Sequence, residues 1–344
     1  MGNTPDLAGQ QTPPAAASKL CRIRIRIRIR ILALTLLLTV GGLTYAQTAD
    51  RSMYGVFDRV PSKFLSVAGV RIQYAQTPGT ITASAEDLDR WLAQAMTAVT
   101  TYFGRFPVSE FKLLIIPSGG KGVRSGNAFG HRGAAVRVFV GTDSTAEDLE
   151  ADWVLVHELT HLAVPSLDRK HHWFEEGLAT YVESIARLQI DDLSPEAVWQ
   201  GLAEGMPHGQ PAAGDRGLDN TPIWGRTYWG GALFCLQADI ELRRATDNRM
   251  GLQDALRGIL DSGGSIEQQW PMERLMAVAD QATGTRVMRD LYAAQSGHPV
   301  VVDLQRLWDR LGVLANADPP GFDDRAPDAD IRLAIGRPEP VGDM

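Results

Sequence analysis

Cysteine is scarce in this chain, with only Cys21 and Cys235 among 344 residues. Two cysteines cannot build the disulfide framework that supports many small secreted domains, so that class of fold is excluded. Cys235 lies in the apolar segment 233–236, and we expect a buried thiol there. With 44% hydrophobic and 22% charged residues, the chain is neither disordered nor fibrous. Its length suffices for one large domain or two smaller ones with a real core.

Positive charge is also in short supply beyond the N-terminus. The chain has 34 Lys and Arg against 41 Asp and Glu, and residues 1–46 hold six of the basic side chains but only one acid, Asp6. The remaining residues therefore carry 28 basic and 40 acidic groups, a net charge of −12. Because binding to a nucleic-acid backbone requires clustered positive charge, we expect no nucleic-acid partner.

The apolar run near the N-terminus is too short to cross a membrane as an ordinary helix. It covers 13 residues, Ile31 to Leu43, where a spanning helix needs about 20. An Arg/Ile repeat precedes the run and Thr44-Tyr-Ala46 follows it, which is typical of a secretory signal cleaved after Ala46. Residues 1–46 are therefore predicted to be a signal peptide or an uncleaved signal anchor. In both cases the rest is exported, to the periplasm or beyond, and an uncleaved segment 31–46 would attach it to the inner membrane.

Hydrophobic periodicity predicts an α+β fold. The pattern indicates a helix over 87–103 and a mostly helical region from residue 144 onward, with a Gly/Pro-rich break over 204–224. Strands are expected at 72–74, 80–82, 111–117 and 134–140, with a Gly-rich loop over 118–130. Residues 47–165 would form a small α/β subdomain and 166–316 a helical one. The tail, 317–344, is predicted to be mostly irregular, with one short strand over 331–335.

The segment from Ser144 to Pro165 predicts a helix that carries the pattern His-Glu-x-x-His. Ser144 and Glu147 form a capping box at its start, and Pro165 marks where it must stop. His157 and His161 lie one turn apart, so their imidazoles can converge on one cation. Glu158 can reach a zinc-bound water without ligating the metal, which is the position of a general base. Apolar neighbours on every side, Trp153 among them, predict that this helix is buried all round.

A zinc ion held by two histidines requires a third protein ligand. Another histidine six residues after His161 is excluded, because that position is Leu167. Farther along, a predicted helix places Glu176, Thr180 and Glu183 on the side opposite its apolar stripe. This polar side faces either water or the metal. The neighbouring Gly177 would allow a close helix contact, which favours Glu176 as the ligand.

These residues resemble a known family. His157-Glu-Leu-Thr-His161, followed by Trp173-Phe-Glu-Glu176-Gly, is similar to the gluzincin peptidases. The likeness is greatest to the aminopeptidase N and glycyl aminopeptidase groups and to the bacterial peptidase MA-like domains. It implies a thermolysin-like zincin fold that binds one Zn²⁺ through His157, His161 and Glu176. Tyr228, in a segment similar to the family's Y-x-x-G helix, would stabilise the oxyanion, although from the residue alone it is as well explained as a packed aromatic.

The sequence departs from the family in two places. Only 14 residues separate His161 from Glu176, several fewer than in aminopeptidase N. The G-x-M-E-N segment, which anchors a free substrate amine in that family, is missing, and residues 126–133 occupy its place. Aminopeptidase specificity is therefore not predicted. The strand 134–140 is instead expected to bind an extended peptide along its edge.

The sequence thus predicts a zinc metallopeptidase of the cell envelope that hydrolyses peptides or proteins. One alternative is a catalytically silent zincin-fold protein that binds a peptide or protein partner, and another is a membrane-anchored structural protein. Of the other histidines, His171 and His172 are either exposed in a loop or contacts of the metal ligands or substrate. His131 stays open, and His208 and His298 receive no role.

Overall fold

The computed structural model describes residues 53–314, 317 and 321–338. The described residues from Phe57 onward form one compact unit, and helix α2 (Met53–Val56) belongs to a separate one. The predicted signal or anchor, residues 1–46, lies outside the described residues. Among the helices that are described, none is both long enough and apolar enough to cross a membrane.

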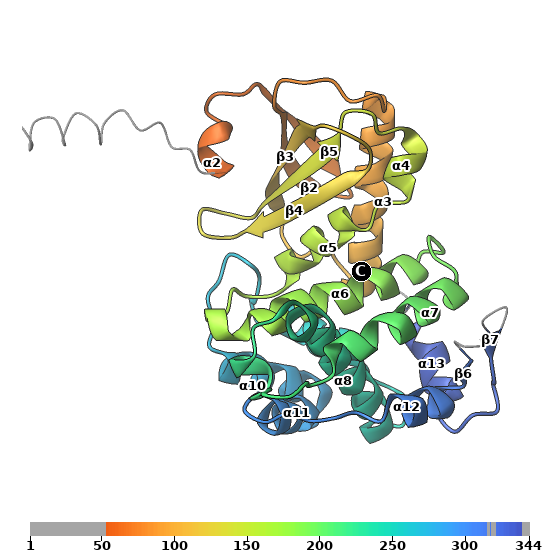
Figure 1. Cartoon of the computed structure of the whole chain (residues 1–344). Helices are drawn as coiled ribbons and strands as arrows, with labels where there is room; N and C mark the ends of the chain where they lie inside the picture. The colour runs from red at the N-terminus through yellow and green to blue at the C-terminus, as the bar shows by residue number, and fades with distance from the viewer. Residues whose placement is uncertain (1–52, 315–316, 318–320, 339–344) are drawn as a thin grey trace, which may run out of the picture. The chain divides into compact units, whose positions relative to one another are not determined.

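A mixed five-stranded sheet makes up the N-terminal part of the unit (Figure 1). Its spatial order is β1-β2-β3-β5-β4, in which β2, β3 and β5 run parallel and the outer strands β1 and β4 are antiparallel to their neighbours. The strands are β1 (Ser62–Val67), β2 (Val70–Gln76), β3 (Glu110–Ser118), β4 (Val123–Phe129) and β5 (Ala135–Gly141).

The strands expected at 111–117 and 134–140 are confirmed as β3 and β5, but two other expectations about the sheet are wrong. Residues 80–82 form no strand, because β2 pairs with β1 instead. The Gly-rich stretch 118–130 contains β4, which pairs with β5 along most of its length. Since β3 and β4 flank β5, the strand 134–140 has no open edge for a peptide. Within the described sheet, the outermost strand on this side is β4, so the open edge is the edge of β4.

Helix α3 (Ala85–Phe103) confirms the helix predicted over 87–103. It begins at Ser84, whose side chain forms a capping box with Asp87, and it ends at Gly104, which has a left-handed backbone. Its apolar stripe lies in a continuous core that also includes buried residues of β3, β5 and the later helices.

The metal-motif segment is two helices rather than one, α4 (Ala146–Glu150) and α5 (Val154–Thr160). The capping box of α4 is Thr145 with Asp148, one residue later than expected. Asp152 interrupts the helix because its carboxylate accepts hydrogen bonds from the backbone N–H groups of Val154 and Leu155, which caps α5. All residues of α5 are buried, as expected, whereas Trp153, which precedes the helix, is 52% exposed, so its expected core position is wrong.

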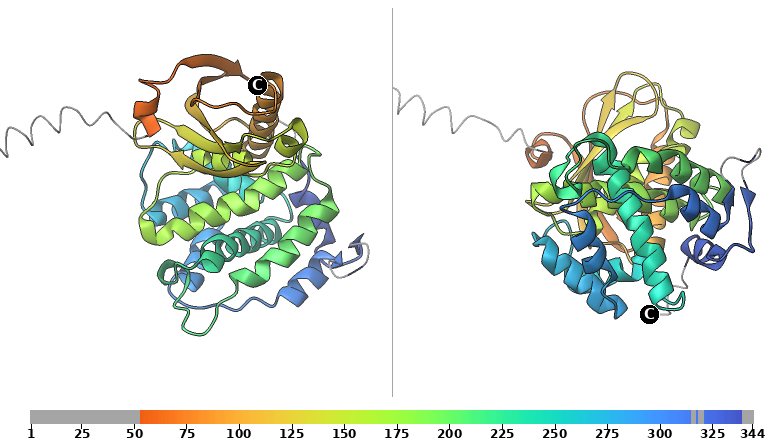
Figure 2. Two further views of the ribbon diagram at one scale, coloured as in Figure 1. Left: turned by 45° about the horizontal axis from the view of Figure 1, so that its top comes forward. Right: turned by 60° about the horizontal axis from the view of Figure 1, so that its bottom comes forward.

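Most of the helices lie on the other side of α6 from the sheet (Figures 1 and 2). Helix α6 spans His172–Leu188. The helices beyond it are α7 (Pro195–Gly205), α8 (Gly231–Ala245), α9 (Leu252–Asp261), α10 (Met272–Thr283), α11 (Val287–Gln295), α12 (Leu304–Leu311) and α13 (Ala329–Ile335). Short turns η1 (His161–Ala163), η2 (Arg169–His171), η3 (Met206–Gly209), η4 (Leu218–Asn220) and η5 (Arg226–Gly230) connect them, and β6 (Val313–Leu314) pairs with β7 (Gly321–Phe322).

Helices α6 and α8 touch through glycine. A Cβ on Gly177 would overlap the Cα of Gly231, and a Cβ on Gly231 would overlap the carbonyl oxygen of Trp173. The two backbones therefore meet without intervening side chains, which is the close helix contact that we expected from Gly177. Beyond this crossing, the Tyr181 hydroxyl of α6 donates a hydrogen bond of 2.9 Å to buried Asp239 of α8.

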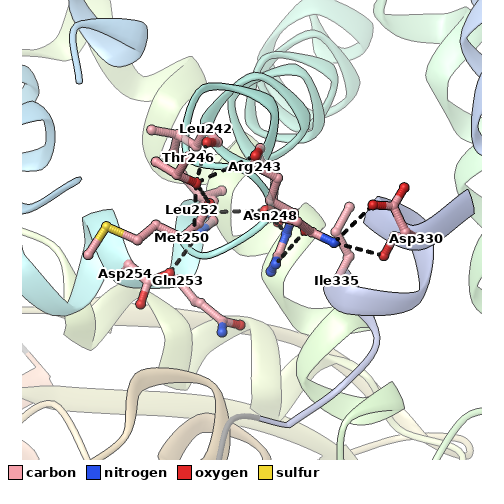
Figure 3. A network of polar contacts seen from close by, with 12 residues as sticks. Leu242, Arg243, Thr246, Asn248, Met250, Leu252, Gln253, Asp254, Asp330 and Ile335 are labelled. Carbon is pink, nitrogen blue, oxygen red and sulfur yellow. Dashed lines mark hydrogen bonds and ion pairs between the residues drawn. The ribbon is translucent and has the colours of Figure 1, made fainter. Parts of the chain in front are cut away.

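The prediction of a strand over 331–335 is wrong, because these residues belong to helix α13. In a strand Ile331, Leu333 and Ile335 would share one face, whereas here the two isoleucines are buried and Leu333 is 41% exposed. Figure 3 shows how this helix is held: the Asn248 side chain, in the turn after α8, donates to the backbone oxygen of Asp330 at 3.2 Å.

Candidate metal centre

Three side chains from two helices converge at the candidate metal centre. His157 lies on α5, His161 directly follows that helix, and Glu176 lies in the second turn of α6. Glu176 Oε2 is 3.2 Å from His157 Nε2 and 3.8 Å from His161 Nε2. One ligand atom from each residue lies within 4.8 Å of the other two. The predicted triad is thus brought together despite the short connection between His161 and Glu176.

The geometry and chemistry of this group fit one zinc ion. Tetrahedral zinc with bonds of about 2.0–2.1 Å places its ligand atoms roughly 3.3 Å apart. The two separations that involve Glu176, 3.2 Å and 3.8 Å, are close to this value. Nδ1 of His157 is buried without a hydrogen-bond partner among the described atoms, while its Nε2 points at the group. Two imidazoles and one carboxylate are a donor set that zinc accepts readily.

The protonation states also suit metal binding. Burial, together with the neighbouring His157, lowers the pKa of His161 to about 3, so this imidazole is neutral at physiological pH. Burial alone would raise the pKa of Glu176, but the hydrogen bond to His157 and the charges of the histidines lower it to about 2. A neutral imidazole and an ionised carboxylate are the forms that ligate a cation.

Glu158 follows His157 on α5 but stays outside the ligand group. Strand β4 packs directly against it, since a Cβ on Gly126 would overlap the Glu158 side chain, and the Ala128 backbone forms a hydrogen bond with its carboxylate. Burial, with a smaller contribution from the charge of Glu176, raises the pKa of Glu158 to about 7. A carboxyl group with this pKa can accept and return a proton near neutrality.

Tyr228 lies on η5, a single π-helical turn that faces the triad. Its ring stacks on the His157 ring with centroids 6.5 Å apart, and its hydroxyl forms a hydrogen bond with Glu176. Burial and the charge of Glu176 raise the pKa of Tyr228 to about 12, so the hydroxyl remains a donor. The adjacent Arg226 is buried and forms an ion pair of 2.8 Å with Asp215, which anchors this turn.

The five predicted site residues line a common cavity of about 420 Å³, which we call the metal cleft. One wall is β4 and the others come from α5, α6 and η5. The β4 residues of this wall include no acidic side chain. A carboxylate positioned like that of the family's G-x-M-E-N segment is therefore absent from this strand.

The remaining histidines divide between packing and the cleft. His171 is buried, and its Nδ1 lies 3.0 Å from Asp219, so the expectation of an exposed loop position is wrong for this residue. His172 is exposed and lines the cleft, with Nε2 3.4 Å from Glu176 Oε1. His131 is exposed and is not among the residues that line the cleft.

Two aromatic residues near the site were missed at the sequence level. Trp153 lines the metal cleft and its ring meets that of His157 edge-on at 5.6 Å, although the sequence pattern predicted a core residue. Trp224 is 62% exposed and its ring lies 6.4 Å from that of Tyr228. The helix break at Asp152 was the available signal for Trp153, since a residue between two helices need not follow their apolar stripe.

No protein-family model matches the chain, and no curated protein matches its sequence. Among solved structures, the chain is similar to an aminopeptidase N family protein from Idiomarina loihiensis, with a TM-score of 0.55 and 15% identity over 74% of this chain and 49% of that one. It also matches an M1 zinc metallopeptidase from Deinococcus radiodurans, with a TM-score of 0.47 and 15% identity over 71% and 53% of the two chains.

The chain therefore has the α+β, zincin-like fold of the aminopeptidase N peptidases, as the resemblance implied. It spans about half the length of the Idiomarina structure. At this level of identity the likeness concerns the fold, so the function must be argued from the site itself.

Proposed function

We propose that this protein is a zinc-dependent metallopeptidase that hydrolyses peptide bonds. The observation that carries the proposal is the placement of Glu158. The carboxylate lies in the same cleft as the triad, adjacent to a ligand, and β4 holds it without involving it in the ligand set. A protein that only bound a metal or a partner would have no need for a fourth side chain with a pKa near 7 in this position.

When bound, zinc would supply Lewis-acid chemistry by activating a water molecule and polarising the scissile carbonyl. His157, His161 and Glu176 would hold the ion. Glu158 accepts the proton of the attacking water and later delivers it to the leaving amine. Tyr228 donates a hydrogen bond to the oxygen on which negative charge develops.

Two variants test this assignment. Glu158→Gln preserves the size of the side chain but cannot accept a proton, so it should keep one zinc ion and lose hydrolysis by at least about 10²-fold. His161→Ala removes a ligand and should lose both the metal and the activity. Metal analysis and a quenched fluorescent peptide library, applied to both variants and to the native protein, measure these effects.

The outcome also separates the alternatives. A native protein that binds one zinc ion and cleaves no peptide would be a silent zincin-fold binding protein. A native protein that binds no zinc would overturn the metal centre itself.

We propose further that the protein is exported to the cell envelope. Support comes from residues 1–46, where a basic stretch, a short apolar run and a small-residue exit follow one another. Edman sequencing of the protein recovered from the periplasm tests this, with Gln47 expected as the first residue if the signal is cleaved.

A further inference from the structure

A second cavity, of about 610 Å³, opens beside the metal cleft between α6, α7 and η5. We call it the aromatic pocket. Its walls are mainly apolar and include Leu193, Val198, Leu202, Trp224 and Trp229. The volume lies within the range of about 300–1,000 Å³ that is usual for ligand pockets.

The aromatic pocket borders the metal cleft and shares two lining residues with it. Trp153 and Tyr228 line both the pocket and the metal cleft. Both rings contact the ring of His157, at centroid distances of 5.6 Å and 6.5 Å respectively. Trp224 then extends the aromatic wall outward from Tyr228. A peptide bound at the metal would therefore have its neighbouring side chain within reach of this pocket.

The charges of the pocket favour an apolar occupant. Among the lining residues that the structure describes, Glu183 is the one carboxylate, and it forms an ion pair of 3.0 Å with Arg187. Arg187 also pairs with Asp192 at 2.5 Å, so one arginine already holds both carboxylates. A Lys or Arg side chain entering the pocket would lose hydration and would have to compete with Arg187 for the single acidic group of the lining. The exposure of Trp153 and Trp224, 52% and 62%, leaves large apolar surfaces open at the mouth.

We propose that the aromatic pocket binds a bulky apolar or aromatic side chain of the peptide substrate, next to the bond that is cleaved. This inference rests on the proposed function and names its substrate class: peptides with Phe, Trp or Leu at one position beside the scissile bond. Burial of such a side chain favours these peptides over Ala counterparts by about 10–100-fold in kcat/KM.

Gly201 provides a way to fill the pocket without disturbing the fold. It lines the pocket from α7, and a Cβ built on it meets nothing within 4 Å. Because glycine is unfavourable inside a helix, Gly201→Phe adds a ring to the pocket at a position where the backbone gains stability. Gly297→Phe is the matched control, since that glycine is also in open space and is not among the residues that line the pocket.

The test uses quenched peptides in which a single Phe is moved through a background of Ala, with cleavage sites located by mass spectrometry. In the native protein we expect the cleavage site to move with the Phe, always at the same number of residues from it. The kcat/KM of the Phe peptides should be about 10–100-fold higher than that of the all-Ala peptide. In Gly201→Phe this ratio should fall below about threefold, whereas Gly297→Phe should retain it. Equal cleavage of Phe and Ala peptides, or an unchanged ratio in Gly201→Phe, would overturn the proposal.

A binding measurement keeps the proposal separate from the activity. Three tryptophans line the pocket, so their fluorescence should report a titration of the zinc-loaded Glu158→Gln protein with the Phe and all-Ala peptides. Tighter binding of the Phe peptide, lost when Gly201→Phe is added, supports the pocket even if no peptide is hydrolysed and the proposed function fails. Equal binding of both peptides overturns it, and so does a fatty acid that binds more tightly than the Phe peptide.

Discussion

At the scale of single residues, the site depends on carboxyl groups that share a cleft but differ in acidity. Glu176 contacts two imidazoles and has a pKa of about 2, whereas Glu158, buried against β4, has a pKa of about 7. The first is suited to hold a cation at all physiological pH values, and the second is suited to move a proton. Environment rather than residue type separates the two roles.

Tyr228→Phe tests the proposed oxyanion donor. Loss of one such donor typically lowers kcat by about 10²–10³-fold, and we expect this decrease with zinc content unchanged because the ring can still pack on His157. Steady-state kinetics with metal analysis measures both quantities. Tyr74→Phe, the same change on β2, is the control and should keep the native kcat. Native turnover in the Tyr228 variant would remove this residue from the mechanism.

The sequence predicted which side chains come together where local helix geometry decides their position. His157 and Glu158 lie on α5 and His161 directly follows it, still one turn from His157, so their relation follows from residue spacing alone. For Glu176 the sequence could only favour a position at the metal over one in water, because periodicity does not say what faces the polar side of a helix. Trp153 was mispredicted because its apolar neighbours suggested a core position, and the exposure of a residue in a helix break depends on tertiary packing.

At the scale of secondary-structure elements, the close crossing of α6 and α8 fixes the position of α6, and with it the position of Glu176 relative to α5. The contact between Gly177 and Gly231 lies one residue from Glu176. Farther along the same pair of helices, Tyr181 bonds to Asp239, which also pairs with Arg243 at 2.9 Å. The Glu176 side chain is therefore positioned by the whole helix pair.

Gly177→Ala should weaken both the fold and the metal site. The added methyl group has no space between the helix backbones, so α6 must shift and move Glu176, and overpacking of this kind costs about 1–3 kcal/mol. Urea unfolding and a competitive zinc titration measure the two effects. Gly201→Ala, a glycine in open space on α7, is the matched control and should be neutral or stabilising by about 0.5–1 kcal/mol. Native zinc affinity in Gly177→Ala would show that the crossing does not position the ligand.

Elements with regular periodicity were predictable from the sequence, and elements defined by their partners were not. Helix α3 has both a capping box and an apolar stripe, and β3 and β5 are apolar runs that suit buried parallel strands. Strand β4 has the composition of a loop, with Gly126 and Asn127 at its centre, and it becomes a strand because β5 offers a free edge. Its role as a wall of the site was invisible for the same reason.

At the scale of the whole compact unit, the C-terminal segment is attached to the earlier helices by charge. Asp328 accepts hydrogen bonds from Arg310 of α12, at 2.7 Å and 2.8 Å, and forms an ion pair with Arg244 of α8. Its side chain is only 7% exposed. Burial would raise the pKa of Asp328, but the two arginines lower it below its usual value of 3.8. The ionised carboxylate therefore stabilises the folded state.

Asp328→Asn should reveal this contribution and its pH dependence. At pH 7 we expect a loss of about 1–3 kcal/mol in the free energy of unfolding, because two arginines lose a charged acceptor. A carboxyl group with a lowered pKa stabilises the folded state fully above about pH 4 and loses this effect as the pH falls through its folded-state pKa. The difference in unfolding free energy between Asp328→Asn and the native protein should therefore narrow toward about pH 3. Urea unfolding at pH 7, 5 and 3 measures it.

The exposed pair of Arg286 and Asp290 offers the control for this prediction. Their side chains are 69% and 65% exposed, so Asp290→Asn should change stability by less than about 0.5 kcal/mol at every pH. A difference between Asp328→Asn and the native protein that is the same at pH 7 and pH 3 would contradict the assigned role of the carboxylate.

The overall architecture was predicted in its class, α+β with a zincin-like arrangement, but its long-range order was not. Strand pairing across the sheet and the helical nature of α13 depend on contacts between segments far apart in sequence. Ile331 and Ile335 fit a helix or a strand equally well until the neighbours of Leu333 are known. Local patterns therefore limited the prediction to elements and their approximate order.

The outer strand β4 has a consequence for how substrates would be told apart. Under the proposed function, a peptide lying along its open edge would meet only main-chain donors and acceptors, and such a ladder holds nearly every sequence in the same register. Proline is the exception, because it lacks the N–H group that the ladder requires. The strand would thus align the backbone of the peptide, and discrimination between one amino acid and the next would fall to cavities that β4 does not line, such as the aromatic pocket.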